Sequence, residues 1–134
     1  MYDENIISWM NDYLHKAAQA LASWLSVMLP KSGEDWWEEC VLSNPQRELI
    51  EKKGLSKLEE LDLAALLRVA NKSWYTMRGY AYLPTSEREC IRDMIGVRNN
   101  WAHVSAELPG KDTIVSDIEC LIRFFAQMNR SGLI

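Results

Sequence analysis

The sequence has no apolar run long enough to cross a membrane. Asparagine, histidine, lysine and glutamine residues interrupt its longest apolar stretch, which lies between Ile6 and Leu29. The first residues also lack the positive charge of a secretory signal and instead include Asp3 and Glu4. These absences argue against membrane insertion and secretion, so we expect a cytoplasmic protein with no membrane partner.

Cysteine is scarce, and the three cysteines, Cys40, Cys90 and Cys120, lie far apart. Their odd number argues against a disulfide framework, and no Cys-x-x-Cys or Cys/His spacing suggests a zinc site. The sequence also lacks a carboxylate cluster and a glycine-rich phosphate loop. We therefore expect reduced thiols in the core of a cytoplasmic protein, with no metal ion and no cofactor.

A surplus of positive charge is missing as well. The chain has 15 Lys and Arg residues against 19 Asp and Glu residues, which gives a formal net charge of −4. Proteins that bind nucleic acid nonspecifically usually present a basic surface. A function directed at RNA would therefore depend on a local basic patch.

Apolar residues at helical spacing are, in contrast, abundant. They form a stripe of several turns in residues 2–29, and shorter stripes follow in 35–42, 45–53, 62–78, 86–103 and 112–128. We find no period-2 strand and no internal repeat. Since 134 residues suit one compact core, the sequence predicts a single domain, residues 1–134, that is an all-α bundle of five or six helices.

Turn and capping residues predict where these helices begin and end. The signals are Pro30–Gly33, Asn44 before Pro45, Gly54, Ser56 with Glu59, Asp62, Gly79, Ser86 with Glu89, Pro109–Gly110 and Asp112. We expect Asp62 to be the N-cap of the helix at residues 62–78, and Gly79 to end that helix. We expect Asp112 to be the N-cap of the last helix.

Residues 91–107, IRDMIGVRNNWAHVSAE, place polar groups on a helix that has just buried three apolar residues. At about 100° per residue, Arg88, Arg92, Asn99 and His103 line up along one side of this helix, and Arg98 flanks them. A phosphate backbone suits such a row of positive charge. We therefore identify Arg88 and Arg92 as candidate RNA-binding residues.

Structural roles compete with each of these interpretations. His103 alone is most often a helix cap, Arg98 could pair with Asp93 or Glu107, and Arg88 and Arg92 could be a solvated face. Trp101 is more typical of packing than of base stacking. His15, among polar residues of the first helix, receives no role.

The hexapeptide RNNWAH resembles the signature of the HEPN superfamily, in which four to six residues separate an Arg from a His and a polar residue commonly follows the Arg. The context, GLSKLEELDLAALLRVANKSWYTMRG followed by the helix ending in VRNNWAH and by a further apolar helix, is similar to the HEPN subtype named for the synthetic-lethal-with-TREX endoribonuclease. It also resembles HEPN modules of large prokaryotic ATPases in phage-defence loci. The resemblance covers residues 36–134.

The resemblance implies an α-helical bundle, a homodimer that brings two motifs into one cleft, and metal-independent RNA cleavage. It assigns His103 as general acid or base and Arg98 as the group that stabilises the transition state. Asn99 would orient His103 or hydrogen-bond the phosphate.

Three functional hypotheses remain open at this stage. The first is a homodimeric HEPN ribonuclease, an endoribonuclease acting as a toxin or phage-defence effector, with an antitoxin or defence-system protein as partner. The second is a noncatalytic HEPN module for dimerisation or for binding RNA or protein, accompanying a larger defence ATPase or nuclease. The third is a monomeric structural bundle in which Arg98 and His103 only cap and pair.

Overall fold

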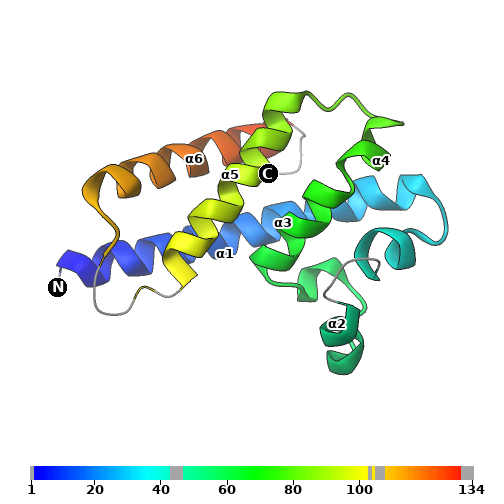
Figure 1. The fold of residues 1–134 in the computed structure, drawn as a ribbon, viewed down its shortest axis with the longest axis horizontal. Helices are drawn as coiled ribbons and strands as arrows, with labels where there is room; N and C mark the ends of the chain where they lie inside the picture. The colour runs from blue at the N-terminus through cyan, green and yellow to red at the C-terminus, as the bar shows by residue number, and fades with distance from the viewer. Residues whose placement is uncertain (1, 43–46, 103, 105–107, 131–134) are drawn as a thin grey trace.

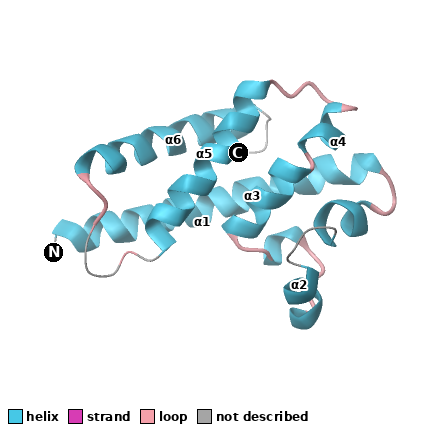
Figure 2. Ribbon diagram, in the orientation of Figure 1, coloured by secondary structure: helices cyan, strands magenta, loops and turns pink. Residues whose placement is uncertain are grey.

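The computed structural model describes residues 2–42, 47–102, 104 and 108–130. Within these ranges the chain is helical and contains no strand, which confirms the all-α prediction (Figure 2). The α-helices are α1 (Tyr2–Met28), α2 (Arg47–Lys53), α3 (Leu63–Lys72), α4 (Trp74–Arg78), α5 (Thr85–Ala102) and α6 (Lys111–Arg130). Three short segments complete the described helical structure: the 3-10 helices η1 (Leu29–Ser32) and η3 (Leu58–Glu60), and a π-helix, η2 (Trp37–Leu42).

Helix α1 is the longest element and runs along the bundle with α6 beside it, while α5 crosses it (Figure 1). Its predicted apolar stripe is confirmed, because Met10, Ala17, Leu21 and Leu25 are completely buried. Burying each of the larger side chains contributes about 1.5–3 kcal/mol before conformational entropy is subtracted. Through this stripe, α1 packs against α3, α5 and α6.

The end of α1 is held by a tyrosine far away in the sequence. The Tyr80 hydroxyl donates a hydrogen bond to the main-chain oxygen of Met28 at 2.8 Å. Burial raises the pKa of the Tyr80 phenol, which keeps it protonated as a donor. This contact satisfies one of the carbonyl groups that a helix C-terminus leaves without an intrahelical partner.

Helix α5 lies between α3 and α6 (Figure 1) and buries one of its faces against them. Cys90, Met94, Val97 and Trp101 form its buried stripe, at the spacing of four, three and four residues expected for one helix face. Trp101 is only 5% exposed, so the interpretation of this residue as core packing is confirmed. Burial of this stripe therefore holds the last turn of α5 against the bundle, and polar residues occupy the opposite face of the helix.

The beginning of α3 shows one capping prediction confirmed and another corrected. Asp62 caps the helix as predicted, since its Oδ1 accepts a hydrogen bond from the Ala65 main-chain N–H at 2.9 Å. In the preceding turn the cap is Glu60 and not Glu59, because the Glu60 carboxylate accepts from the main-chain N–H groups of Ser56 and Lys57, both at 3.1 Å.

Other helix boundaries also differ from the prediction. The helix expected between Asp62 and Gly79 is divided at Ser73, where φ is −87° and ψ is 2°, and the turn there places the Trp74 ring 6.1 Å from that of Trp24. The last helix begins at Lys111 and not at a cap on Asp112. Asp112 lies inside its first turn, where a carboxylate still interacts favourably with the helix dipole.

Helix α2 ends where the sequence predicted, whereas its predicted start lies outside the described residues. Gly54 ends the helix with φ +65°, a left-handed conformation that glycine adopts without steric cost. Asn44 and Pro45, the predicted cap and first helical residue, are not among the described residues.

All three cysteines are free and buried, as the sequence predicted for core thiols. Cys90 on α5 and Cys120 on α6 hydrogen-bond to each other, which lowers the pKa of Cys90 and raises that of Cys120. The pair thus lies at the contact between the two helices. None of the helices in the described ranges is long and apolar enough to cross a membrane.

Candidate functional site

The last turn of α5 holds Arg98 and Asn99 next to each other at the surface. Arg98 is half-buried, Asn99 is exposed, and Arg98 Nη1 donates a hydrogen bond to Asn99 Oδ1 at 3.3 Å. The asparagine therefore orients the guanidinium group while most of the five arginine donors stay available. His103, predicted as the acid or base, lies outside the described residues, so no geometry relates it to this pair.

A buried carboxylate fixes the two residues that follow. Asp117 on α6 is 5% exposed and accepts hydrogen bonds from Asn100 Nδ2 at 3.1 and 3.3 Å and from Trp101 Nε1 at 2.8 Å. These bonds satisfy buried polar groups of both helices at once. They join the end of α5 to α6, and so hold Arg98 in place indirectly.

Sequence reasoning missed Asp117, although a signal was present. Cys120, Leu121, Phe124 and Met128 form the buried stripe of α6, and Asp117 occupies the preceding position on the same stripe. An acidic residue at a core position of an amphipathic helix needs a buried hydrogen-bond partner. That pattern alone indicates a structural or functional contact.

Arg98 also lines a cleft of about 720 Å³ between α1, the segment before α3 and the end of α5. From α5 the cleft receives Arg98, Trp101 and Ala102, and from α1 it receives His15 and Gln19, whose Nε2 atoms are 3.4 Å apart. The structure therefore brings His15, to which the sequence assigned no role, into the same cleft as Arg98. The signal in the sequence was the four-residue spacing of polar residues on α1.

Three carboxylates line this cleft, and each already has a hydrogen-bonding role in the fold. Glu59 accepts from the Ser26 hydroxyl at 3.1 Å, while Glu60 and Asp62 cap the helical segments described above. The cleft is consequently mixed in charge, with the positive charge supplied by Arg98. In the described ranges, no three His, Cys, Asp or Glu side chains form a group that could hold a metal ion.

Of the two ion pairs considered for Arg98, the one with Asp93 is not formed. Asp93 instead pairs with Arg123 of α6, at 3.6 Å. The other candidate partner, Glu107, lies outside the described residues. Arg98 makes no ion pair with any residue that the structure describes.

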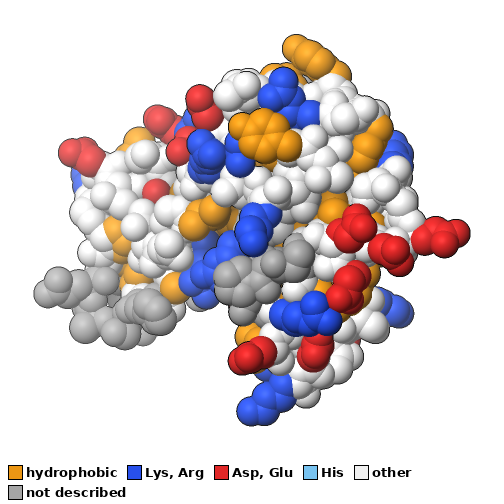
Figure 3. Space-filling model, turned by 45° about the vertical axis from the view of Figure 1, so that its right-hand side comes forward, with side chains coloured by type: hydrophobic (Ala, Val, Ile, Leu, Met, Phe, Trp, Pro, Cys, Tyr) orange, Lys and Arg blue, Asp and Glu red, His pale blue; other side chains and the backbone are white. Residues whose placement is uncertain are grey.

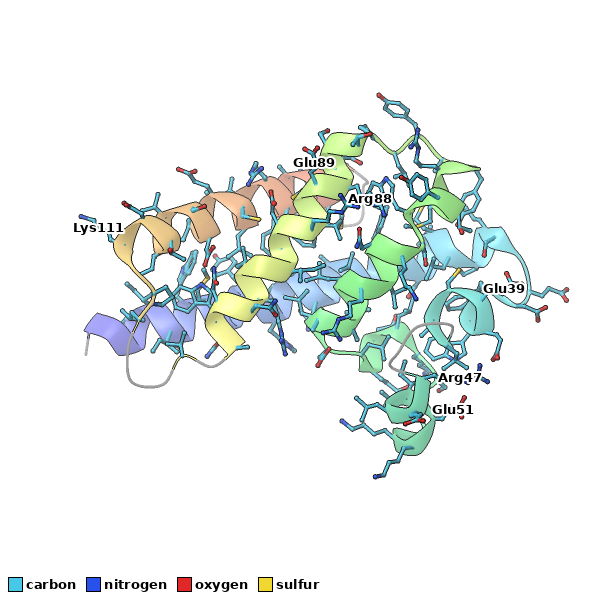
Figure 4. All side chains as sticks on the ribbon, in the orientation of Figure 1. Glu39, Arg47, Glu51, Arg88, Glu89 and Lys111 are labelled. Atoms are coloured by element: carbon cyan, nitrogen blue, oxygen red, sulfur yellow. The ribbon has the colours of Figure 1, made fainter. Side chains whose placement is uncertain are left out.

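The two predicted RNA-binding arginines lie further back on α5 and contact α3 and α4. Arg88 donates from Nε to Asn71 Oδ1 at 3.1 Å and from Nη2 to the Asn71 main-chain oxygen at 3.3 Å. Its guanidinium carbon is 4.7 Å from the centre of the Tyr75 ring, a cation–π contact. Arg92 is exposed and reaches the same Asn71 Oδ1 at 3.4 Å. Figure 4 shows Arg88 between α5 and the α3–α4 region.

These contacts give Arg88 a structural role beside the predicted one, which stays a prediction. The described geometry brings Arg88 and Arg92 together at Asn71, and it joins Asn99 by a hydrogen bond to Arg98, which lines the cleft. The side of α5 that sequence reasoning treated as one row is therefore divided between two sets of contacts.

We expect Arg88→Ala to lower the free energy of unfolding by about 1–2 kcal/mol, because it removes two hydrogen bonds and a cation–π contact. Urea denaturation followed by circular dichroism measures this change. Glu89→Ala is the matched control, since Glu89 is the exposed neighbour on the same helix. Equal stability of the two variants would contradict the structural role of Arg88.

Comparison with known proteins identifies the family to which the chain belongs. The family model described as Swt1-like HEPN matches residues 11–125, a range that includes most of α1, all of α5 and the RNNWAH hexapeptide. No curated protein and no solved structure matches the chain. A match over most of the sequence, on an all-helical fold, shows that the chain belongs to the Swt1-like HEPN family.

Proposed function

We propose that the protein is a HEPN endoribonuclease that cleaves RNA without a metal ion, using Arg98 and His103. The observation that carries the proposal is the position of Arg98, which lines a cleft at the end of α5 and has no ion-pair partner in the described part of the chain. An arginine held by a neighbouring amide presents a fork of donors suited to a phosphate group.

The reaction that fits these residues is transesterification within the RNA strand. The 2′-oxygen forms a bond to the adjacent phosphorus while the bond from phosphorus to the 5′-oxygen breaks. A base takes the proton from the 2′-hydroxyl and an acid donates one to the departing 5′-oxygen. Arg98 stabilises the negative charge that develops on the phosphoryl oxygens. The products are a 2′,3′-cyclic phosphate and a 5′-hydroxyl, and no external oxidant or water is consumed.

A homodimer supplies the two proton-transfer groups in this proposal. One imidazole cannot serve readily as acid and base in a single turnover, whereas His103 from each of two copies divides the roles. Asn99 has the role of orienting Arg98, to which it is hydrogen-bonded. In a cell, such an enzyme is a toxin or phage-defence effector, with an antitoxin or defence-system protein as its partner.

The charge distribution is compatible with RNA as substrate in spite of the net negative charge. On the face shown in Figure 3, several Lys and Arg side chains lie near the middle, while others lie at the edges among Asp and Glu side chains. Arg92 and Arg68 are both exposed. A local concentration of cations of this kind can engage a phosphate backbone.

A second candidate function rests on the carboxylates of the cleft. Glu59, Glu60 and Asp62 outnumber the one arginine that lines the cleft, and the whole chain is acidic. Under this alternative the protein is a noncatalytic HEPN module that dimerises or binds RNA or another protein, in the company of a larger defence ATPase or nuclease.

Cleavage assays on the His103→Ala variant separate the two functions. We expect the wild-type chain to cut single-stranded or transfer RNA in the presence of EDTA, and the variant to lose this activity because the proton-transfer group is gone. Circular dichroism and size-exclusion chromatography should show an unchanged fold and oligomeric state. Equal cleavage by wild type and variant would refute the proposal, and no cleavage by either would favour the noncatalytic module.

A further inference from the structure

A second groove continues from the cleft on the other side of Arg98. It measures about 420 Å³ and lies between α2, the turn before α3, α3 itself and α5. Arg98, Glu60, Leu61 and Asp62 line both the cleft and the groove. The two hollows therefore meet at Arg98, the residue to which the proposed function assigns the phosphate.

Three cations from three different helices line this second groove, namely Lys53 of α2, Arg68 of α3 and Arg98 of α5. None of the three forms an ion pair with a described residue. Among the described residues, Arg47 and Arg123 do form ion pairs: Arg47 lies 2.9 Å from Glu38 and 2.6 Å from Glu51, and Arg123 lies 3.6 Å from Asp93. The groove thus brings together three cations, from three helices, that form no ion pair within the described residues.

The carboxylates of the groove do not neutralise these cations directly. Glu60 accepts hydrogen bonds from two main-chain N–H groups, and Asp62 accepts one from Ala65. These main-chain N–H groups offset part of the negative charge of the two carboxylates. Lys53, Arg68 and Arg98 consequently remain available for an anion brought in from outside.

Apolar side chains complete the lining of the groove. Leu49 on α2 is 52% exposed and Leu55 is half-buried, whereas Ile50 is almost completely buried. Sites for single-stranded nucleic acid combine a positively charged groove that follows the backbone with side chains, usually aromatic, that contact the bases. The groove has the cations, and its exposed leucine offers a base an apolar contact in place of an aromatic ring. A duplex would instead keep the faces of its bases stacked inside and present its backbone and the base edges of its shallow minor groove.

We infer that this groove binds phosphodiester groups of single-stranded RNA, with Lys53 and Arg68 holding the strand where it continues from the phosphate at Arg98. The inference rests on the proposed function for the identity of the strand. It assigns binding residues on α2 and α3, outside the Arg-to-His motif. Their role is to hold the strand, and they take no part in proton transfer.

Binding measured in the cleavage-deficient His103→Ala chain tests the groove separately from catalysis. The probe is a fluorescein-labelled 12-nucleotide single-stranded RNA, and fluorescence anisotropy gives its dissociation constant over a series of salt concentrations. In this background we compare the double variant Lys53→Gln/Arg68→Gln with Lys52→Gln/Lys72→Gln. The control removes the same charge from the same two helices at exposed residues that do not line the groove.

The groove variant is expected to bind RNA severalfold more weakly and to lose about 1.4 from the slope of log affinity against log salt, because two phosphate contacts disappear. The control should keep the parent slope. Equal weakening in both double variants would overturn the inference, since it would reflect net charge alone. An equal effect of the groove variant on a 12-base-pair RNA duplex would also overturn it.

Cleavage and binding together show which claim fails. If replacing Lys53 and Arg68 changes neither RNA cleavage nor RNA binding, the proposed function stands and the role of the groove is refuted. Groove-dependent binding without any cleavage by the wild-type chain supports the groove and removes the nuclease. Absence of RNA binding in the parent chain overturns the inference.

Discussion

Arg98→Ala should reduce the rate of RNA cleavage by about 10²–10³-fold, the cost of removing one preorganised donor of charge stabilisation from an active site. The fold should be almost unaffected, within about 0.5 kcal/mol, because Arg98 is half-buried and makes no ion pair with the described residues. Rates measured under single-turnover conditions, together with urea denaturation, check both parts of the prediction.

Two further variants sharpen the result for Arg98. Arg98→Lys keeps the charge but loses the planar fork that hydrogen-bonds Asn99, so it should recover only part of the lost rate. Arg123→Ala removes an exposed arginine on α6, paired with Asp93, and should cleave like the wild-type chain. Cleavage by Arg98→Ala at the wild-type rate would remove Arg98 from the site.

Asp117→Ala should lower the free energy of unfolding by about 2–4 kcal/mol. The substitution leaves the Trp101 indole N–H and the Asn100 amide without their acceptor and opens a small cavity between α5 and α6. Urea denaturation measures the change, with the exposed neighbour Glu119 as the control position. Asp117→Asn retains one acceptor oxygen for the indole, so its loss of stability should be smaller.

Asp117→Ala should also lose more cleavage activity than its loss of folded protein explains. Asp117 does not line the cleft, but it holds Asn100 and Trp101, the two residues that directly follow the Arg98–Asn99 pair. A loosened last turn of α5 would displace the guanidinium group, and small displacements of this kind are costly in an active site. Full activity in the folded fraction of Asp117→Ala would show that this anchor contributes to stability alone.

The helical framework could be predicted because its causes are local. The apolar stripe of α1 repeats with the period of the helix, and the Asp62 cap needs only the three residues that follow it. The division at Ser73 instead accompanies the packing of Trp74 against Trp24 of another helix, a contact that the local sequence does not show. The cap on Glu60 in place of Glu59 is a shift of one residue within a pattern that was otherwise recognised.

The candidate site was predictable only in part, because its components come from distant segments. Arg98 and Asn99 were found through the motif they share with the HEPN superfamily. In the structure they are hydrogen-bonded to each other, and Arg98 lines a cleft. His15, which lines the same cleft, is brought there by the packing of α1 beneath α5. To predict the role of Asp117, the buried stripe of α6 has to be compared with the hydrogen-bond donors available on α5.

The central claim is RNA cleavage by transesterification, and the chemistry of the fragment ends tests it most directly. We would incubate the wild-type chain in EDTA with a single-stranded RNA of defined sequence and identify both new ends by mass spectrometry. The account predicts a 2′,3′-cyclic phosphate on one fragment and a 5′-hydroxyl on the other, both absent with Arg98→Ala and His103→Ala. Fragments ending in a 3′-hydroxyl and a 5′-phosphate, or intact RNA, would contradict it.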